Sequence, residues 1–306
     1  MSLEHLRREI QKKKPKIHSI TNTITINDCA NLILAAGGSA TMASDAAEAA
    51  EMTRHTDALV LNLGAVSSLD AMLLAGKEAN KKNHPIVFDP VAAGSTALRR
   101  DASRKLMEQL SLTAIRGNTA EIHTLAALSR KLTDEKANTT TDSFFSFVDV
   151  ESGHSMQKSK IETYLCDARQ LSQNTGAIVI VSGIDDLVVS QETYTVIEGG
   201  SALSSHITGS GCMLTELIAV CLASVNEKKQ ILPWDAVCSA VHWMNQAAEA
   251  AERLTRQAGG GTMTYRMHLI DAISQPLLQS ESQNLSRSTK KGNRYGKHRS
   301  PFPEKQ

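Results

Sequence analysis

Between residues 16 and 181, apolar residues gather in short continuous runs, separated by longer segments in which apolar positions recur at helical spacing. Short continuous apolar runs are typical of strands that are buried on both faces of a parallel sheet. The predicted strands are Ala58–Leu63, Pro85–Asp89, Thr113–Ile115 and Ala177–Val181. Their alternation with helical segments predicts βαβ units, and therefore an α/β fold with a mostly parallel sheet.

Two of the intervening helices have recognisable starts. Ser67 is followed by Asp70 at the spacing of a helix N-terminus, and Asn118 is followed by Glu121 at the same spacing. An acid in the first turn and a small polar residue before it are the usual signals of a helix start. A further helix is predicted over Leu32–Ala36, directly after a polar segment.

The pattern changes after Val181. The runs Leu187–Val189 and Thr193–Ile197 are close enough to form an antiparallel hairpin at a sheet edge. The C-terminal third is helical by spacing, with predicted helices over Gly211–Ala223, Pro233–Arg256 and Met263–Ile273. The segment Thr133–Ser159 has few periodic apolar positions, which predicts a long surface loop.

The charge balance excludes a general affinity for polyanions. The 306 residues carry 33 Lys and Arg against 32 Asp and Glu, which leaves a formal net charge of +1. A nearly neutral chain gains little by releasing counterions from nucleic acid or from an anionic membrane. Residues 281–306 are locally basic and almost free of aliphatic residues, which predicts a disordered tail. This tail is either a solvated extension or a weak polyanion-binding arm.

Cysteine usage and the N-terminal sequence indicate a cytoplasmic protein. The five cysteines, Cys29, Cys166, Cys212, Cys221 and Cys238, are odd in number and never form a C-x-x-C pair. That pattern excludes a small disulfide scaffold and an obvious zinc knuckle. The N-terminus has no apolar signal core, and no window approaches the roughly 18 uninterrupted apolar residues of a membrane helix.

The strongest local signal for chemistry is the glycine-rich turn Thr208–Thr215, which leads directly into an apolar helix. Gly209 and Gly211 let backbone N–H groups approach a ligand, and the helix N-terminus adds a partial positive charge that suits a phosphoryl group. Cys212 lies in the first turn, where the helix dipole lowers a thiol pKa and makes the side chain a possible proton acceptor. The alternatives are an ordinary strand-to-helix turn and a small core cysteine.

Two charged segments follow predicted strands at the edge where ligands of open α/β sheets collect. Asp89 ends one strand, and the segment Ile115–Glu121 offers Arg116, an amide and a second carboxylate, Glu121. Two carboxylates with water molecules can hold Mg²⁺, which prefers oxygen ligands. The structural alternatives are a turn residue for Asp89 and a first-turn acid for Glu121.

The segment His18–Asn31 is rich in side-chain amides and hydroxyls, including Asn22. Side chains of this kind either cap turns or face a polar ligand. After it, Gly37 and Gly38 lead to Met42. Methionine after such a turn can line an adaptable apolar pocket or fill a core position.

In this order, the motifs resemble those of the hydroxyethylthiazole kinases, a thiamine-salvage group of the ribokinase-like family. The most specific matches are H-S-I-T-N at 18–22, the glycine segment ending at Met42, L-N-L-G at 61–64, D-P-V-A-A-G at 89–94, I-R-G-N-T-A-E at 115–121 and T-G-S-G-C-M-L-T at 208–215. The resemblance implies a single ribokinase-like domain over residues 1–280, built as a three-layer α/β/α sandwich with an antiparallel edge.

The resemblance also implies the reaction and the residues that serve it. The reaction is phosphoryl transfer from ATP, with Mg²⁺, to the hydroxyl of 4-methyl-5-(2-hydroxyethyl)thiazole in a homotrimer whose active sites lie at subunit interfaces. The implied roles are substrate binding for Met42, Gly209 and Asn22, ATP binding for Arg116 and Ser182, metal binding for Asp89 and Glu121, and catalysis for Cys212, Gly209 and Gly211.

Three positions depart from the family pattern. Glycine is common where Ala92 stands, threonine where Ser182 stands, and glutamate where Ile184 stands. Ala92 strains its loop if its φ must be positive, and Ile184 removes a carboxylate from the nucleotide region. These departures leave open a non-catalytic sensor that binds nucleotide or thiazole.

Two enzyme alternatives can also be compared with the motifs. A pyrimidine-alcohol kinase of the same pathway has different motifs near its substrate. A nicotinamide dehydrogenase would need a G-x-G-x-x-G turn after the first strand, and the sequence has none there.

Overall fold

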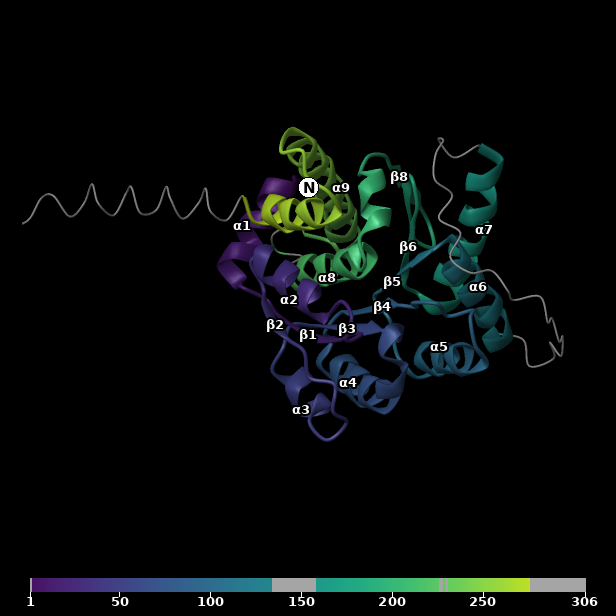
Figure 1. The fold of residues 1–306 in the computed structure, drawn as a ribbon. Coiled ribbons are helices and arrows are strands. Elements are labelled where there is room, and N and C mark those ends of the chain that lie inside the picture. The colour runs from purple at the N-terminus through teal and green to yellow at the C-terminus, as the bar shows by residue number, and fades with distance from the viewer. Residues whose placement is uncertain (1, 134–157, 226–227, 229–230, 276–306) are drawn as a thin grey trace, which may run out of the picture.

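The computed structural model describes residues 2–133, 158–225, 228 and 231–275. One eight-stranded sheet runs through this part of the chain in the order β2-β1-β3-β4-β5-β6-β7-β8 (Figure 1). Neighbouring strands from β2 to β6 are parallel, and β7 and β8 continue the sheet with antiparallel pairing. The strands are β1 Lys16–Ile20, β2 Ser39–Thr41, β3 Ala58–Asn62, β4 Ile86–Asp89, β5 Ala114–Asn118, β6 Ile178–Ser182, β7 Asp186–Val189 and β8 Tyr194–Ile197.

Helices cover both faces of the sheet and make the outer layers of a sandwich (Figure 1). One layer contains α1 Leu3–Lys13, α2 Ile26–Ala35, α8 Ser210–Ala223, α9 Pro233–Gln257 and the helix over residues 262–275. The other contains α3 Ala49–Arg54, α4 Leu69–Lys82, α5 Ala97–Gln109, α6 Thr119–Thr133 and α7 Lys158–Thr175. Short 3₁₀ segments cover Leu63–Ser68 and Ala202–His206.

Strand residues alternate between two hydrophobic cores, as the period of two of a β-strand requires. In β3, Val60 packs into the core under α8, whereas Leu59 and Leu61 pack into the core under α4. The central helix α8 is buried from Met213 to Ala223, because α1, α2 and α9 pack around it. The predicted three-layer α/β/α architecture with an antiparallel edge is confirmed.

The local predictions are confirmed in part. The hairpin of β7 and β8 forms as expected. The capping box of α6 also forms: the Asn118 side-chain oxygen accepts the Glu121 N–H at 2.9 Å, and the Asn118 N–H donates to Glu121 at 2.8 Å. The helix start predicted at Ser67 is wrong, because a 3₁₀ segment occupies that position and α4 begins at Leu69.

The helix predicted over Leu32–Ala36 begins earlier than the sequence suggested, at Ile26. The side chains of Asn27 and Asn31 lie on its exposed side, where the Asn31 amide donates to the Asn27 carbonyl at 2.9 Å. The buried side of the helix holds Cys29, Leu32 and Ile33 together with Asp28, whose carboxylate accepts a hydrogen bond from Arg266. The polar first turns are therefore the solvent face of an amphipathic helix.

Two predictions concern residues outside the described part of the chain. The loop expected over 133–159 falls almost entirely on residues 134–157, and the basic tail comprises residues 281–306. Among the described residues, no helix is both long enough and apolar enough to cross a membrane.

Candidate active site

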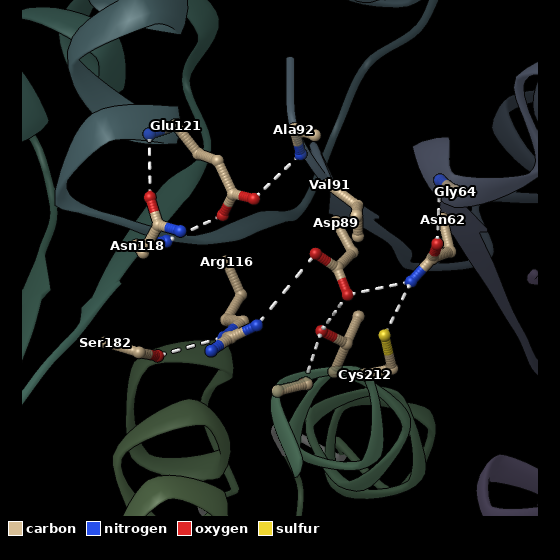
Figure 2. A network of polar contacts seen from close by, with 12 residues as sticks. Asn62, Gly64, Asp89, Val91, Ala92, Arg116, Asn118, Glu121, Ser182 and Cys212 are labelled. Atoms are coloured by element: carbon tan, nitrogen blue, oxygen red, sulfur yellow. Dashed lines mark hydrogen bonds and ion pairs between the residues drawn. The ribbon is translucent and has the colours of Figure 1, made fainter. Parts of the chain in front are cut away.

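The candidate site is formed where four neighbouring parallel strands end. The register pairs Asn62 of β3 with Asp89 of β4, and Asn118 of β5 with Ser182 of β6. The parallel strands therefore present their last polar side chains at one edge of the sheet. The N-terminus of α8 faces the same edge (Figure 2).

Asp89 is the buried anion at the centre of the network (Figure 2). Its Oδ2 accepts hydrogen bonds from Asn62 Nδ2 at 2.9 Å and Thr215 Oγ1 at 3.1 Å, while its Oδ1 has no hydrogen-bond partner within the described residues. Burial raises the pKa of this carboxyl to about 6, with Arg116 opposing and Glu121 adding to the rise. Asp89 therefore holds an unsatisfied oxygen that can bind a cation.

Arg116 joins the strand ends to α8. Its Nε donates to Ser182 Oγ at 2.9 Å, and its Nη1 lies 3.9 Å from Asp89 Oδ1. A Cβ atom on Gly211 would lie 2.1 Å from that Nη1, so only glycine lets the guanidinium lie against the helix. Because the guanidinium and the helix N-terminus are both positive, the space they share favours an anion such as a phosphoryl group.

Gly209 precedes α8 with a φ of +87°, in the left-handed region that glycine adopts without strain. A Cβ atom there would lie 2.6 Å from Thr25 Cγ2. The turn therefore requires glycine for two independent reasons, its backbone angle and its close approach to the start of α2.

Cys212 contacts the amides of the network. Its Sγ accepts from Asn62 Nδ2 at 3.2 Å and lies 3.8 Å from Asn22 Nδ2. Burial, with Asp89 adding to it, raises the pKa of the thiol to about 12. The predicted lowering of this pKa is wrong, because the loss of solvent and the nearby carboxylate outweigh the helix dipole. The side chain is a neutral thiol at physiological pH.

Glu121 shapes the loop after β4. Its two carboxylate oxygens accept the N–H groups of Ala92 and Asn118, each at 2.8 Å. Ala92 has a φ of +53°, which confirms the strain expected for a residue with a Cβ atom at this position. Each Glu121 oxygen still has a lone pair available for a cation or a water molecule.

Asn22 and Met42 lie at the ends of two further strands. The Asn22 side-chain oxygen accepts from the N–H groups of Ile24 and Thr25, both at 3.1 Å, which directs its amide nitrogen toward Cys212. Met42 follows β2 at the same edge, and its side chain is half-buried. The strand order places Met42 two strands away from β3, outside the polar network of Figure 2.

Three polar residues that the sequence analysis did not assign belong to this region. Asn62 bridges Asp89 and Cys212, and Thr215 donates to Asp89. Glu216, which is 1% exposed, accepts a hydrogen bond from Ser19 at 2.5 Å, and burial raises its pKa to about 8. Their positions in the sequence could have indicated them. Asn62 is a polar residue at the end of a buried strand, and Thr215 and Glu216 are polar residues on the otherwise apolar helix α8.

The protein ligands for a metal ion are few. Within the described ranges, no group of three or more His, Cys, Asp and Glu side chains is arranged to hold a metal. Among the described residues, three buried side-chain oxygens lack a hydrogen-bond partner: Thr21 Oγ1, Glu216 Oε2 and Asp89 Oδ1. Asp89 Oδ1 is the one that faces Arg116, and Glu121 holds the loop after β4 through the Ala92 N–H. This sparse set of oxygen donors fits Mg²⁺, which keeps water molecules and binds substrate phosphates.

Comparisons with known proteins identify the family. Residues 7–279 match the model of the hydroxyethylthiazole kinase family. The hydroxyethylthiazole kinase of Desulfovibrio desulfuricans is 38% identical over 274 residues, which cover 87% of this chain and 90% of the relative.

Solved structures agree in the fold. Hydroxyethylthiazole kinase protein from Pyrococcus horikoshii has a TM-score of 0.71 at 26% identity, covering 89% of this chain and 92% of that one. A ribokinase-like superfamily protein from Enterococcus faecalis, at 12% identity, has a TM-score of 0.55 and covers 89% of this chain and 94% of its own. The predicted ribokinase-like fold is confirmed, and this chain belongs to the hydroxyethylthiazole kinase family.

Proposed function

We propose that this protein transfers the γ-phosphoryl group of ATP to the hydroxyl of 4-methyl-5-(2-hydroxyethyl)thiazole, and so salvages the thiazole half of thiamine. The observation that carries the proposal is the pairing of Asp89 Oδ1 with the Arg116 guanidinium, 3.9 Å apart, beside Gly211 at the start of α8. In a member of this kinase family, that arrangement suits a nucleotide phosphate that brings a cation with it.

The chain's own residues bind and orient the two substrates. Backbone N–H groups from Gly209 to Gly211 take the transferring phosphoryl group, and Arg116, steadied by Ser182, binds the nucleotide phosphates. Met42 and Asn22 contact the thiazole alcohol. The alcohol oxygen forms a bond to the γ-phosphorus, the bond from that phosphorus to the bridging oxygen of ADP breaks, and the hydroxyl proton passes to phosphate oxygens or water.

Asp89 is the direct protein ligand for Mg²⁺ in this proposal, and Glu121 binds it through water or through a free lone pair. Bound Mg²⁺ neutralises charge on the nucleotide phosphates. Asn62 and Thr215 both donate to Asp89 Oδ2, which leaves Oδ1 directed away from them. The hydrogen bonds of Asn62 and Thr215 therefore orient the carboxylate for binding.

Cys212 acts as a neutral thiol that contacts the reacting hydroxyl, not as a strong base, because its pKa lies near 12. A loose phosphoryl transition state needs little help from a base, since bond formation to the nucleophile is not far advanced. Positioning by Asn62, which donates to the sulfur at 3.2 Å, fits that limited role.

We also propose that the protein acts as a cytoplasmic homotrimer. The described surface has exposed apolar side chains at Ile24 just before α2, at Leu34 of α2, and at Met263 and Met267 of the helix over residues 262–275. A hydrogen-bonded ion pair between Arg266 and Asp28 joins the two helices. Exposed large apolar side chains on neighbouring helices favour a protein contact. Sedimentation velocity should give the mass of a trimer, and Met267→Glu should shift it toward the monomer.

One experiment separates the proposed enzyme from its alternatives. The purified protein is mixed with ATP, Mg²⁺ and the thiazole alcohol, and ADP release is followed together with the mass of the organic product. Thiazole phosphate formed in step with ADP supports the proposal. Binding of both substrates without ADP release would indicate a sensor, and phosphorylation of a hydroxymethylpyrimidine in preference to the thiazole would indicate the pyrimidine kinase.

A further inference from the structure

A buried histidine links β1 to the segment that carries Met42. His18 lies in β1 and is fully buried. Its Nδ1 lies 2.7 Å from Thr53 Oγ1 in α3, and its Nε2 lies 2.7 Å from the carbonyl oxygen of Ala43. Because Ala43 directly follows Met42, one imidazole ring connects β1, α3 and the start of the segment after β2.

The partners of the ring fix the positions of its protons. A carbonyl oxygen can only accept, so Nε2 carries the hydrogen that is donated to Ala43. Burial lowers the pKa of His18, although the Ala43 carbonyl and Glu48 oppose the change, so the ring is neutral at physiological pH. Nδ1 is then an acceptor, and the Thr53 hydroxyl donates to it.

Thr53 has an alternative acceptor, whereas the Ala43 carbonyl depends on the ring. Thr53 Oγ1 also lies 2.9 Å from the carbonyl oxygen of Ala49, one helical turn earlier in α3. One hydroxyl proton serves a single strong bond, so loss of the imidazole would let Thr53 donate to Ala49. Removal of the ring therefore leaves only the Ala43 carbonyl without its donor.

The segment from Met42 to Ala49 has few other anchors near Met42. Its later part is held by Asp45, whose side chain accepts the Ala47 N–H at 2.8 Å and whose carbonyl accepts the Ala49 N–H at 3.0 Å. Upstream, the sheet pairing of β2 ends with Thr41 beside His18. The His18 bond to Ala43 therefore fixes the backbone between the last strand pair and the turn at Asp45, the part of the segment that carries Met42.

We infer that His18 is a positioning residue for the thiazole: it holds the Ala43 carbonyl and thereby fixes the Met42 side chain against the ring of the substrate. His18 does not touch the substrate and acts only through this segment. The inference rests on the proposed function, in which Met42 binds the thiazole. It predicts a selective effect on the affinity for the alcohol and none on the nucleotide site, which lies on β4, β5, β6 and α8.

The test compares two variants that remove opposite halves of the bridge. His18→Phe keeps a buried aromatic ring but removes the donor to Ala43, whereas Thr53→Val keeps the imidazole and its bond to Ala43. Calorimetry without nucleotide measures the Kd of the thiazole alcohol, and steady-state kinetics measures the KM for each substrate. In His18→Phe, the Kd and KM for the alcohol should rise roughly tenfold, the equivalent of one hydrogen bond. The KM for ATP should change less than about twofold, which is within the variation of neutral substitutions.

Thr53→Val should leave the affinity for the alcohol within about twofold of wild type, since the Ala43 bond remains. An unchanged Kd in His18→Phe would overturn the inference, as would an equal loss of alcohol affinity in Thr53→Val or an equal rise in the KM for ATP. If the wild-type protein neither binds nor phosphorylates the alcohol, the proposed function fails before any variant is compared.

A second measurement applies even if His18→Phe does not fold. His18→Asn retains an acceptor for Thr53 and is too short to reach Ala43. His18→Asn is then combined with Met42→Ala in a double-mutant cycle. His18→Asn should weaken alcohol binding when Met42 is present and cause no further loss of affinity in the Met42→Ala protein. Equal losses in both backgrounds would show that His18 does not act through Met42.

Discussion

Replacement of Asp89 with asparagine should stabilise the metal-free protein, and the gain should grow as the pH rises. Burial raises the pKa of Asp89 from 3.8 to about 6. The folded protein therefore holds the Asp89 proton more tightly than the unfolded chain does between these two values. In this window the unfolded state binds fewer protons, so the contribution of Asp89 to stability falls as the pH rises and then levels off above the folded pKa.

The size of the change in unfolding free energy follows from the shift in the pKa of Asp89. A difference of about two pKa units corresponds to roughly 3 kcal/mol of unfolding free energy. Asparagine cannot ionise, so Asp89→Asn avoids this loss. The asparagine amide can place a donor near Arg116 Nη1, which lies 3.9 Å from Oδ1 of the original Asp89. The free-energy cost of a donor beside the guanidinium is the same at every pH. The slope against pH, and not the absolute stability, is therefore diagnostic.

The measurement is urea unfolding of both proteins in a chelating buffer from about pH 4.5 to about pH 7.5, with the difference in unfolding free energy plotted against pH. Glu216 adds to the same trend, because the charge of Asp89 contributes to its raised pKa and Asp89→Asn removes that contribution. Asp271→Asn, which makes the same chemical change on an exposed side chain, controls for the amide itself. A difference that stays flat across the range would refute the reasoning that Asp89 is ionised at a cost to the fold.

Added Mg²⁺ and ADP should reverse the comparison. A ligand at a hundredfold excess over its Kd stabilises the folded state by about 2.7 kcal/mol, nearly the cost of ionising Asp89. Wild-type protein should gain this stability, and Asp89→Asn should gain much less while losing phosphotransfer. Equal stabilisation of both proteins by Mg²⁺ and ADP would exclude Asp89 as the ligand that carries the cation.

Four further substitutions probe the same network. Asn62→Leu removes the donors to Asp89 and Cys212, and steady-state kinetics should show kcat/KM reduced roughly ten- to a hundredfold, as expected for a lost hydrogen bond to a charged group. Gly211→Ala forces Arg116 out of the position it occupies against the helix, so the KM for ATP should rise at least about tenfold; an unchanged KM would contradict the anion-site assignment. Cys212→Ala should slow turnover roughly tenfold with ATP affinity nearly retained, and an unchanged kcat would remove the thiol from the mechanism. Ala92→Gly relieves a left-handed backbone and should raise the unfolding free energy by up to about 1 kcal/mol in urea titration, whereas a clear loss of stability would show that the backbone there is not strained.

Much of the fold could be predicted from local patterns in the sequence. Continuous apolar runs predicted β3, β4, β5 and β6, and a capping pair predicted the start of α6. The short strand β2 carries little apolar signal, because Ser39 and Thr41 lie at an edge. The early start of α2 was missed because its first turns carry exposed amides and because the first buried residue, Asp28, is charged.

Site residues could be predicted only where the local sequence alone indicates their chemical role. Asp89 is a charged residue at the end of β4, Arg116 is a charged residue within β5, and Gly209 lies at a helix start, so each is informative alone. Asn62 becomes informative only through the register that sets it beside Asp89, a pairing between distant segments that no local pattern reveals. The thiol of Cys212 shows the same limit, since its pKa depends on burial and on a carboxylate from another strand.

Along a strand such as β3, the apolar residues contribute to stability and the last residue contributes to the site. Residues such as Val60 and Leu61 fill the two cores, while the next residue, Asn62, enters the polar network at the carboxyl edge. The costly features, an ionised and buried Asp89 and a left-handed Ala92, both lie beyond the apolar part of β4. A cation bound together with a phosphate would offset the cost of ionising Asp89. Its positive charge would stabilise the carboxylate in place of the water that burial excludes. The two cores therefore have to provide an excess of stability in the absence of substrate, and the apolar residues on both faces of β3 and β4, up to the edge where the site begins, contribute to it.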